Sequence, residues 1–103
     1  MKPVVWSLDA LDDLDSIVTY IATENPRAAL QVIERIESAC AALGHMATGR
    51  PGRVSGTYEK MVTGLPHIIV YTIDLRPGGS ERIVILRAIH GARNWPEEGW
   101  PEK

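Results

Sequence analysis

The sequence has few of the features that mark secreted, membrane-bound or metal-dependent small proteins. Of its 103 residues only one, Cys40, is a cysteine, which excludes a disulfide framework and is typical of a reduced, cytoplasmic setting. No apolar run approaches the roughly 18 residues of a membrane span, and the N-terminus has no signal-like apolar core. Because Cys40 has no flanking base, we interpret it as buried filler rather than a nucleophile. We expect a single cytoplasmic domain over residues 1–103.

Motifs for metals, phosphates and cofactors are also missing. The three histidines, His45, His67 and His90, are dispersed, and with a single cysteine they give no metal-ligand spacing. The stretch GRPGR at residues 49–53 lacks the Lys-Ser/Thr pair of a phosphate loop and follows no predicted strand. We therefore predict no metal and no cofactor.

Charge is nearly balanced overall but unevenly spread. Residues 1–49 hold three basic and seven acidic groups, a balance of −4, whereas residues 50–93 hold seven basic and three acidic groups, a balance of +4. This polarity would present a basic face to nucleic acid or to an acidic partner, although chance is an equal explanation. A pI near 5.9 is unlike that of a dedicated nucleic-acid binder. Neither sequence-specific nucleic-acid binding nor a membrane partner is expected.

Two helices are predicted in the first half of the chain. Ser7 is a suitable N-cap for the first, and Asp13 with its acidic neighbours falls on the polar face. The apolar residues at helical spacing share the opposite face: Leu8, Leu11, Leu14, Ile17, Val18 and Ile21. Asn25 and Pro26 end this helix and begin the second, which Gly44 closes. The short connection predicts an antiparallel helical hairpin.

The second half of the chain has the patterns of strands. After a predicted loop at residues 45–56, alternating or continuously apolar segments replace the helical period, and the loop RPGGS joins the last two segments. Four segments are predicted as strands: residues 3–6, 57–62, 67–73 and 82–89. The order β-α-α-β-β-β implies an α+β fold, with the helical hairpin on one face of a mainly antiparallel sheet.

The last predicted strand ends in cationic and aromatic side chains, within the stretch ILRAIHGARNWP at residues 85–96. Arginine interleaved with tryptophan is typical of protein-binding surfaces. Together with two arginines of the predicted loop, these residues are predicted to contact a partner or target: Arg50, Arg53, Arg87, His90, Arg93 and Trp95. Structural roles remain open: an acid of the first helix or Glu59 would pair with Arg87, and His90 would be a hydrogen-bonded histidine at a strand end.

Four segments carry a resemblance to a known family: VVWSLDALDDLDSIVTYI, GRPGRVSGTYEKMV, LPHIIVYTI and IVILRAIHGARNWP, of which the final R-x-x-H-x-A-R-x-W is the most specific. They resemble the RelE/ParE superfamily of toxins from bacterial type II toxin–antitoxin modules, the ParE branch more than the RelE branch. Tyr58 departs from the arginine that many relatives carry there. The resemblance implies a plasmid-stabilisation type of toxin that inhibits DNA gyrase through protein–protein contact.

The resemblance also implies a partner. A ParD-like antitoxin is expected to neutralise the toxin by wrapping the helix hairpin and the sheet edge, as an amphipathic helix plus an added strand.

RelE-like relatives instead cut mRNA on the ribosome without a metal, which gives an alternative function. Such cleavage needs a base for the 2′-hydroxyl, an acid for the leaving oxygen and cations on the phosphate. The candidates are Glu59 as base, His90 as acid and Arg87 with the other arginines on phosphate. Strand alternation places Arg87 and His90 on opposite faces unless a bulge intervenes. Ile68 replaces an arginine of several RNA-cleaving relatives, and three lysines form no cluster. We therefore predict a non-enzymatic toxin.

Overall fold

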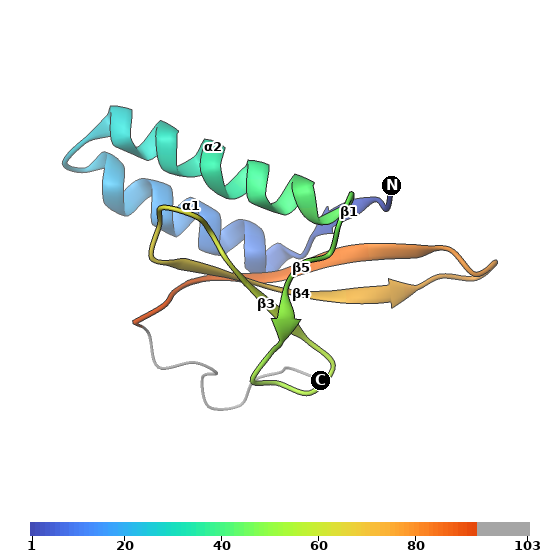
Figure 1. Cartoon of the computed structure of the whole chain (residues 1–103). Helices are drawn as coiled ribbons and strands as arrows, with labels where there is room; N and C mark the ends of the chain where they lie inside the picture. The colour runs from blue at the N-terminus through green and yellow to red at the C-terminus, as the bar shows by residue number, and fades with distance from the viewer. Residues whose placement is uncertain (93–103) are drawn as a thin grey trace.

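In the described part of the chain, two helices lie side by side over one face of a five-stranded sheet (Figure 1). The structure, a computed structural model, describes residues 1–92. The helices are α1 (Leu8–Ala22) and α2 (Pro26–Leu43), joined by a three-residue turn. The predicted α+β class and the helical hairpin on a mainly antiparallel sheet are confirmed.

Both helices begin at the caps that the sequence predicts. The Ser7 Oγ accepts a hydrogen bond from the Ala10 N–H at 3.0 Å and donates one to the Leu86 carbonyl oxygen at 3.1 Å. The first bond caps α1, and the second fixes its start against the last strand. In α2 the Asn25 Oδ1 accepts from the Ala28 N–H at 3.0 Å, and Pro26 occupies the first turn.

Gly44 is the C-cap of α2, as predicted, but a left-handed conformation is not the reason for the glycine. Its φ is −66°, in the right-handed region. A Cβ at this position would lie 2.6 Å from the Lys2 carbonyl oxygen, and the Lys2 N–H donates to the Gly44 carbonyl oxygen at 2.8 Å. The glycine therefore allows the N-terminal segment to approach the end of α2 closely.

The apolar face of α1 differs from the prediction at its first turns. Leu8 and Leu11 are exposed, whereas Ala10 and Leu14 are buried and Ile17 packs against the core. The stripe that contacts the sheet therefore begins at Ala10 and continues three, four and seven residues later. Ala10 is small and gives no hydrophobic signal in the sequence. The predicted stripe therefore began at Leu8, which is too early.

The strands are β1 (Val4–Trp6), β2 (Arg50–Pro51), β3 (Tyr58–Met61), β4 (His67–Leu75) and β5 (Glu81–His90), in the spatial order β1-β5-β4-β3-β2. Among the strands of residues 1–92, β1 alone is parallel to its neighbour. The predicted RPGGS hairpin is confirmed, with Gly78 and Gly79 at φ of 91° and 89°. Strand β2 lies within the segment predicted as a loop, which is rich in glycine and proline; both residues of the strand are exposed, and no apolar alternation marks them.

The core lies between the helices and the sheet. Ile36 of α2 packs there with the helix-facing side chains of β4 and β5, among them Tyr71 and Ile85. A smaller apolar cluster lies on the opposite face of the sheet and contains Ile68, Val70 and Ile89, with Val54 packed against it. Strand β4 is thus apolar on both faces, as the sequence predicted. Cys40 is buried in the main core, where burial and then the charge of Glu37 raise the pKa of its thiol to about 12.

A β-bulge interrupts the pairing of β4 with β5. Val70 pairs with Arg87, but the next residue, Tyr71, pairs with Ile85, so Leu86 is the extra residue. Beyond the bulge, Ala88 belongs to the helix-facing core and Ile89 to the opposite cluster. The end of β5 therefore presents a different set of side chains to the helices than uninterrupted alternation would give.

Candidate functional site

Within residues 1–92, the predicted site residues lie on two different faces of the sheet. Arg50, Arg53 and Glu59 lie together around the β2–β3 hairpin, and Arg87 and His90 lie at the end of β5. Two further predicted contacts, Arg93 and Trp95, lie outside the described residues.

Glu59 holds the loop that carries the arginines. Its side chain is 9% exposed, and its Oε2 accepts a hydrogen bond from the Arg53 N–H at 2.9 Å. The Arg53 Nε lies 3.7 Å from the Glu59 Oε1. Glu59 pairs with Val70 of the second cluster, so it faces away from the helices. Arg50 is opposite Glu59 in the ladder and is exposed. This group is therefore a carboxylate-anchored loop with an exposed arginine.

Arg87 is held by an acid of the first helix, one of the structural roles left open for it. The Arg87 Nε lies 2.7 Å from the Asp13 Oδ2, and its Nη2 lies 3.0 Å from Oδ1, while the Ala88 N–H donates to Oδ2 at 2.9 Å. The Arg87 and Asp13 side chains are 10% and 12% exposed. The hydrogen bond with Asp13 raises the pKa of Arg87 above its ordinary value, against the opposing effect of burial. This bidentate pair ties α1 to β5.

The assignment of Asp13 to the polar face of the first helix was wrong. Asp13 lies three residues after Ala10 and four before Ile17, within the stripe that faces the sheet. An acid inside an apolar stripe is the signal that sequence analysis missed. It indicates a buried cationic partner, here Arg87.

The bulge brings Arg87 and His90 to one cavity. Uninterrupted alternation would separate them, but with Leu86 as the extra residue both line a cavity of about 590 Å³ beside α1. The expectation that they lie on opposite faces is therefore corrected. Leu86 itself gives no sequence signal of a bulge, because it is neither glycine nor proline.

His67 is a further residue of this cavity, which sequence analysis noted only as a dispersed histidine. It pairs directly with His90 across β4 and β5, and the two ring centroids are 5.5 Å apart, edge to face. Burial, and then the charge of His90, lowers the pKa of the His67 imidazole, so His67 is neutral near pH 7. The exposed His90 accepts a hydrogen bond at its Nδ1 from the Ala92 N–H at 3.1 Å.

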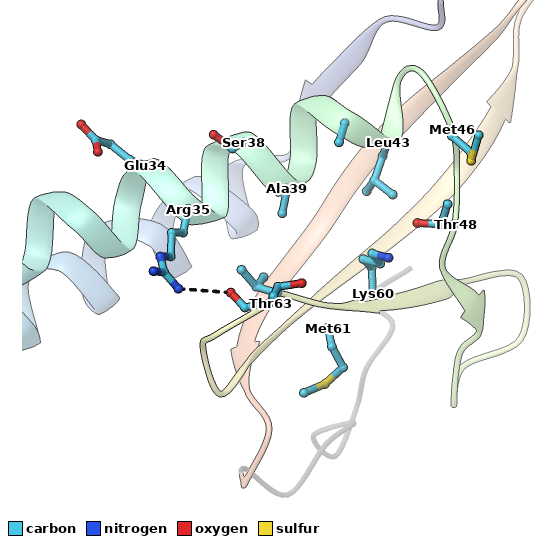
Figure 2. Close-up of a pocket in the computed structure, with 12 residues that line it drawn as sticks. Glu34, Arg35, Ser38, Ala39, Leu43, Met46, Thr48, Lys60, Met61 and Thr63 are labelled. Carbon is cyan, nitrogen blue, oxygen red and sulfur yellow. Dashed lines mark hydrogen bonds between the residues drawn. The ribbon is translucent and has the colours of Figure 1, made fainter.

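A groove runs between α2 and β3, as expected for a helical hairpin on a sheet, and has a volume of about 780 Å³ (Figure 2). Ala39, Leu43 and Val62 form apolar lining. Arg35 reaches from α2 toward β3, where its Nη1 donates to the Thr63 carbonyl oxygen at 3.4 Å. Lys60 brings a second cation to the groove and Glu34 brings one acid, so the groove combines an apolar lining with a small excess of positive charge.

The sheet edge beside this groove is partly open. Strand β2 pairs only with Tyr58 and Glu59, so within residues 1–92 no strand pairs with the outer edge of Lys60 and Met61. Met61 and Met46 are exposed next to that edge. An unpaired edge beside an apolar groove is the geometry that accepts an added strand and an amphipathic helix.

The proposed acid and base of RNA cleavage are not assembled. Glu59 faces the second cluster, whereas His90 lines the cavity on the helix side, so the sheet separates them.

Among the residues that the structure describes, no three His, Cys, Asp or Glu side chains gather in a way that would hold a metal ion. No described helix is long and apolar enough to cross a membrane.

Comparison with known proteins gives one family match and a similar curated sequence. The family described as the ParE toxin of the type II toxin–antitoxin system parDE matches residues 4–95. The candidate toxin Y4kP of Sinorhizobium fredii is 39% identical over 97 residues, which covers 93% of this chain and 95% of Y4kP.

Two solved structures are similar in fold. A chain of the chromosomal ParDE toxin–antitoxin system from P. aeruginosa superposes with a TM-score of 0.76 and 26% identity, covering 87% of this chain and 96% of that one. A chain of the RelBE2 toxin–antitoxin complex from Mycobacterium tuberculosis has a TM-score of 0.55 and 25% identity, covering 86% and 96%.

Proposed function

Because this chain belongs to the ParE toxin family of type II toxin–antitoxin systems, we propose that it arrests growth by binding and inhibiting DNA gyrase. In this proposal the toxin is a single, non-enzymatic domain that acts in the cytoplasm. Its target contacts are the exposed Arg50, Arg53 on the Glu59-anchored loop, and His90 at the end of β5. The predicted contacts Arg93 and Trp95 complete the set.

The observation that carries this proposal is the separation of Glu59 from His90. A general base and a general acid must both reach one scissile phosphate, within hydrogen-bond distance of the protons they move. Here the sheet lies between the two side chains, and Glu59 is engaged by Arg53. Arg87 is held in a buried pair with Asp13. These arrangements argue against the RelE-like ribonuclease alternative and favour inhibition by surface contact.

The Glu59→Gln variant distinguishes gyrase inhibition from RNA cleavage in cells. We expect growth arrest by this variant to match that of the native toxin, because glutamine retains an oxygen that accepts the Arg53 N–H. Loss of a catalytic base would lower a cleavage rate by about 10²- to 10⁴-fold. The measurement is growth after induced expression, with DNA breaks and mRNA cuts mapped in the same cultures. Arrest that disappears together with mRNA cuts would support the ribonuclease instead.

A cognate, ParD-like antitoxin is the second part of the proposal. Both similar structures come from toxin–antitoxin systems. The groove between α2 and β3 suits an amphipathic helix, and the open edge at Lys60 and Met61 suits an added strand. Arg35 and Lys60 outnumber the one acid of the lining, Glu34, and so favour an acidic segment beside the apolar contact. We propose that the antitoxin occupies this groove and edge.

Met61→Asp tests the position of the antitoxin. We expect at least about tenfold weaker binding of the antitoxin encoded beside the toxin gene, because the new carboxylate would stand on the edge that the added strand covers and would repel the acidic segment proposed for the antitoxin. Leu75→Asp is the matched control, since Leu75 is an exposed residue at the far end of β4. Titration calorimetry measures both affinities. Equal affinities for the two variants would place the antitoxin elsewhere.

A further inference from the structure

The cavity at the end of β5 shares His90 with the proposed target contacts but has further features that gyrase inhibition does not use. It is bounded by the C-terminal half of α1, Val32 of α2, the turn between β3 and β4, and the last residues of β5. Its volume of about 590 Å³ lies in the range of small-molecule sites.

The lining of the cavity combines apolar and polar side chains. Ile17, Ile21 and Leu65 contribute apolar walls. His67, His90 and the Asp13–Arg87 pair contribute the charged and titratable groups of the lining. A site with apolar walls and a few converging polar groups matches a ligand that has an apolar body and one polar head.

His67 is the residue that points most strongly to a ligand. Its side chain is only 7% exposed, and its Nδ1 is buried with no hydrogen-bond partner within the described residues. Buried polar atoms in native proteins almost always have partners, because an unsatisfied one is destabilising. The Nδ1 atom itself is closed to solvent, so a ligand head in the cavity would accept its N–H after the His67 ring turned about the Cβ–Cγ bond, which exchanges the positions of Nδ1 and Cδ2.

His90 supplies a second donor on the same side. Because its Nδ1 accepts the Ala92 N–H, the neutral ring must carry its hydrogen on Nε2. Asp13 is the one acid among the described lining residues, and its oxygens are engaged by Arg87 and the Ala88 N–H. The paired Asp13 and Arg87 balance each other, so the histidines determine which head group fits.

We propose that this cavity binds a carboxylate carried on a short apolar body, with the carboxylate at His67 and His90 and the body against Ile17, Ile21 and Leu65. The same chemistry is found in a free organic acid and in an acidic side chain of a partner. The site goes beyond the proposed gyrase inhibition and does not depend on it.

The test is an NMR titration of the full-length toxin with 4-phenylbutanoate, and with 4-phenylbutanamide as the neutral probe. We expect the carboxylate to shift the imidazole resonances of His67 and His90 and to bind about tenfold more tightly than the amide, since charge-assisted hydrogen bonds are the stronger ones. Equal affinity of the two probes, or no binding of either, would overturn the proposal.

Variants assign the binding to this cavity. His90→Ala removes one donor, and Ile17→Trp fills the apolar end, so each should weaken the carboxylate probe by about tenfold or more. His45→Ala is the matched control, because His45 is exposed and outside the cavity. Dispersed amide spectra verify that each variant is folded. Unchanged affinity in both cavity variants would contradict the proposal.

A second arm distinguishes the two sources of the carboxylate, and it alone rests on the proposed antitoxin. Probe binding to the intact toxin–antitoxin complex would assign the site to a free acid. Competition between the probe and the antitoxin would assign it to an acidic side chain of the antitoxin. Either result supports a carboxylate site, provided that the histidine variants weaken the probe.

Discussion

Asp13→Ala is expected to lower the free energy of unfolding by about 3–5 kcal/mol, because it leaves the buried Arg87 guanidinium without its carboxylate. The Arg87 side chain is 10% exposed, so water can replace the lost partner only in part. The Ala88 N–H also loses its acceptor. Urea unfolding, followed by circular dichroism, measures the loss.

Asp74→Ala is the matched control for the buried pair. Arg82 and Asp74 have an Nε–Oδ2 distance of 2.9 Å, similar to that of the buried pair, but their side chains are 38% and 43% exposed. Exposed pairs are screened by solvent, and we expect a loss of about 1 kcal/mol or less. If Asp13→Ala cost no more than Asp74→Ala, the pair would not be holding α1 to β5.

Tyr71→Ala is expected to lower the free energy of unfolding by about 3–5 kcal/mol, because it leaves a large cavity in the core. The Tyr71 ring is fully buried and stacks on Tyr58, with ring centroids 5.5 Å apart. Its hydroxyl oxygen accepts the Gly49 N–H at 2.9 Å, so the ring also secures the segment that leads into β2. Urea unfolding again measures the loss.

Two further variants separate the contribution of the packed Tyr71 ring from that of its hydrogen bond. Tyr71→Phe keeps the ring but leaves the Gly49 N–H without its acceptor, for an expected loss of about 1–3 kcal/mol. Tyr20→Ala, at an exposed tyrosine of α1, should change stability by about 0.5 kcal/mol or less. A loss for Tyr71→Phe as large as that for Tyr71→Ala would show that the hydrogen bond, and not packing, dominates.

The helices and the main strands could be predicted because their signals are local. Ser7 and the Asn25-Pro26 pair mark the helix starts through caps formed within one turn. The two glycines of RPGGS mark the hairpin through backbone conformation alone. In each case the residue that carries the signal also makes the local structure.

The cavity could not be predicted because its geometry depends on register. Pairing counted from the RPGGS hairpin without interruption would place His67 opposite Ile89, and the bulge at Leu86 places it opposite His90 instead. One extra residue thus moves Ala88 and His90 to the helix side, where Asp13 holds Arg87. A bulge set by tertiary contacts leaves no pattern in the sequence.

The groove between α2 and β3 was predictable in kind but not in its residues. A helical hairpin on a sheet implies a groove and an edge. Which part of the edge is open depends on the two-residue strand β2, which pairs with Tyr58 and Glu59 of β3 and leaves Lys60 and Met61 uncovered. Strand β2 is a strand because its backbone pairs with β3, and its sequence shows no apolar alternation. The whole segment was therefore predicted as a loop.

The central claim is that the toxin inhibits DNA gyrase through surface contact. The most direct measurement is supercoiling of relaxed plasmid by purified gyrase, with the native toxin freed of its antitoxin and with His90→Ala alongside. We predict that the native toxin abolishes supercoiling or traps cleaved DNA, and that folded His90→Ala is a weaker inhibitor. Full supercoiling in the presence of a toxin preparation that still arrests growth would contradict the claim.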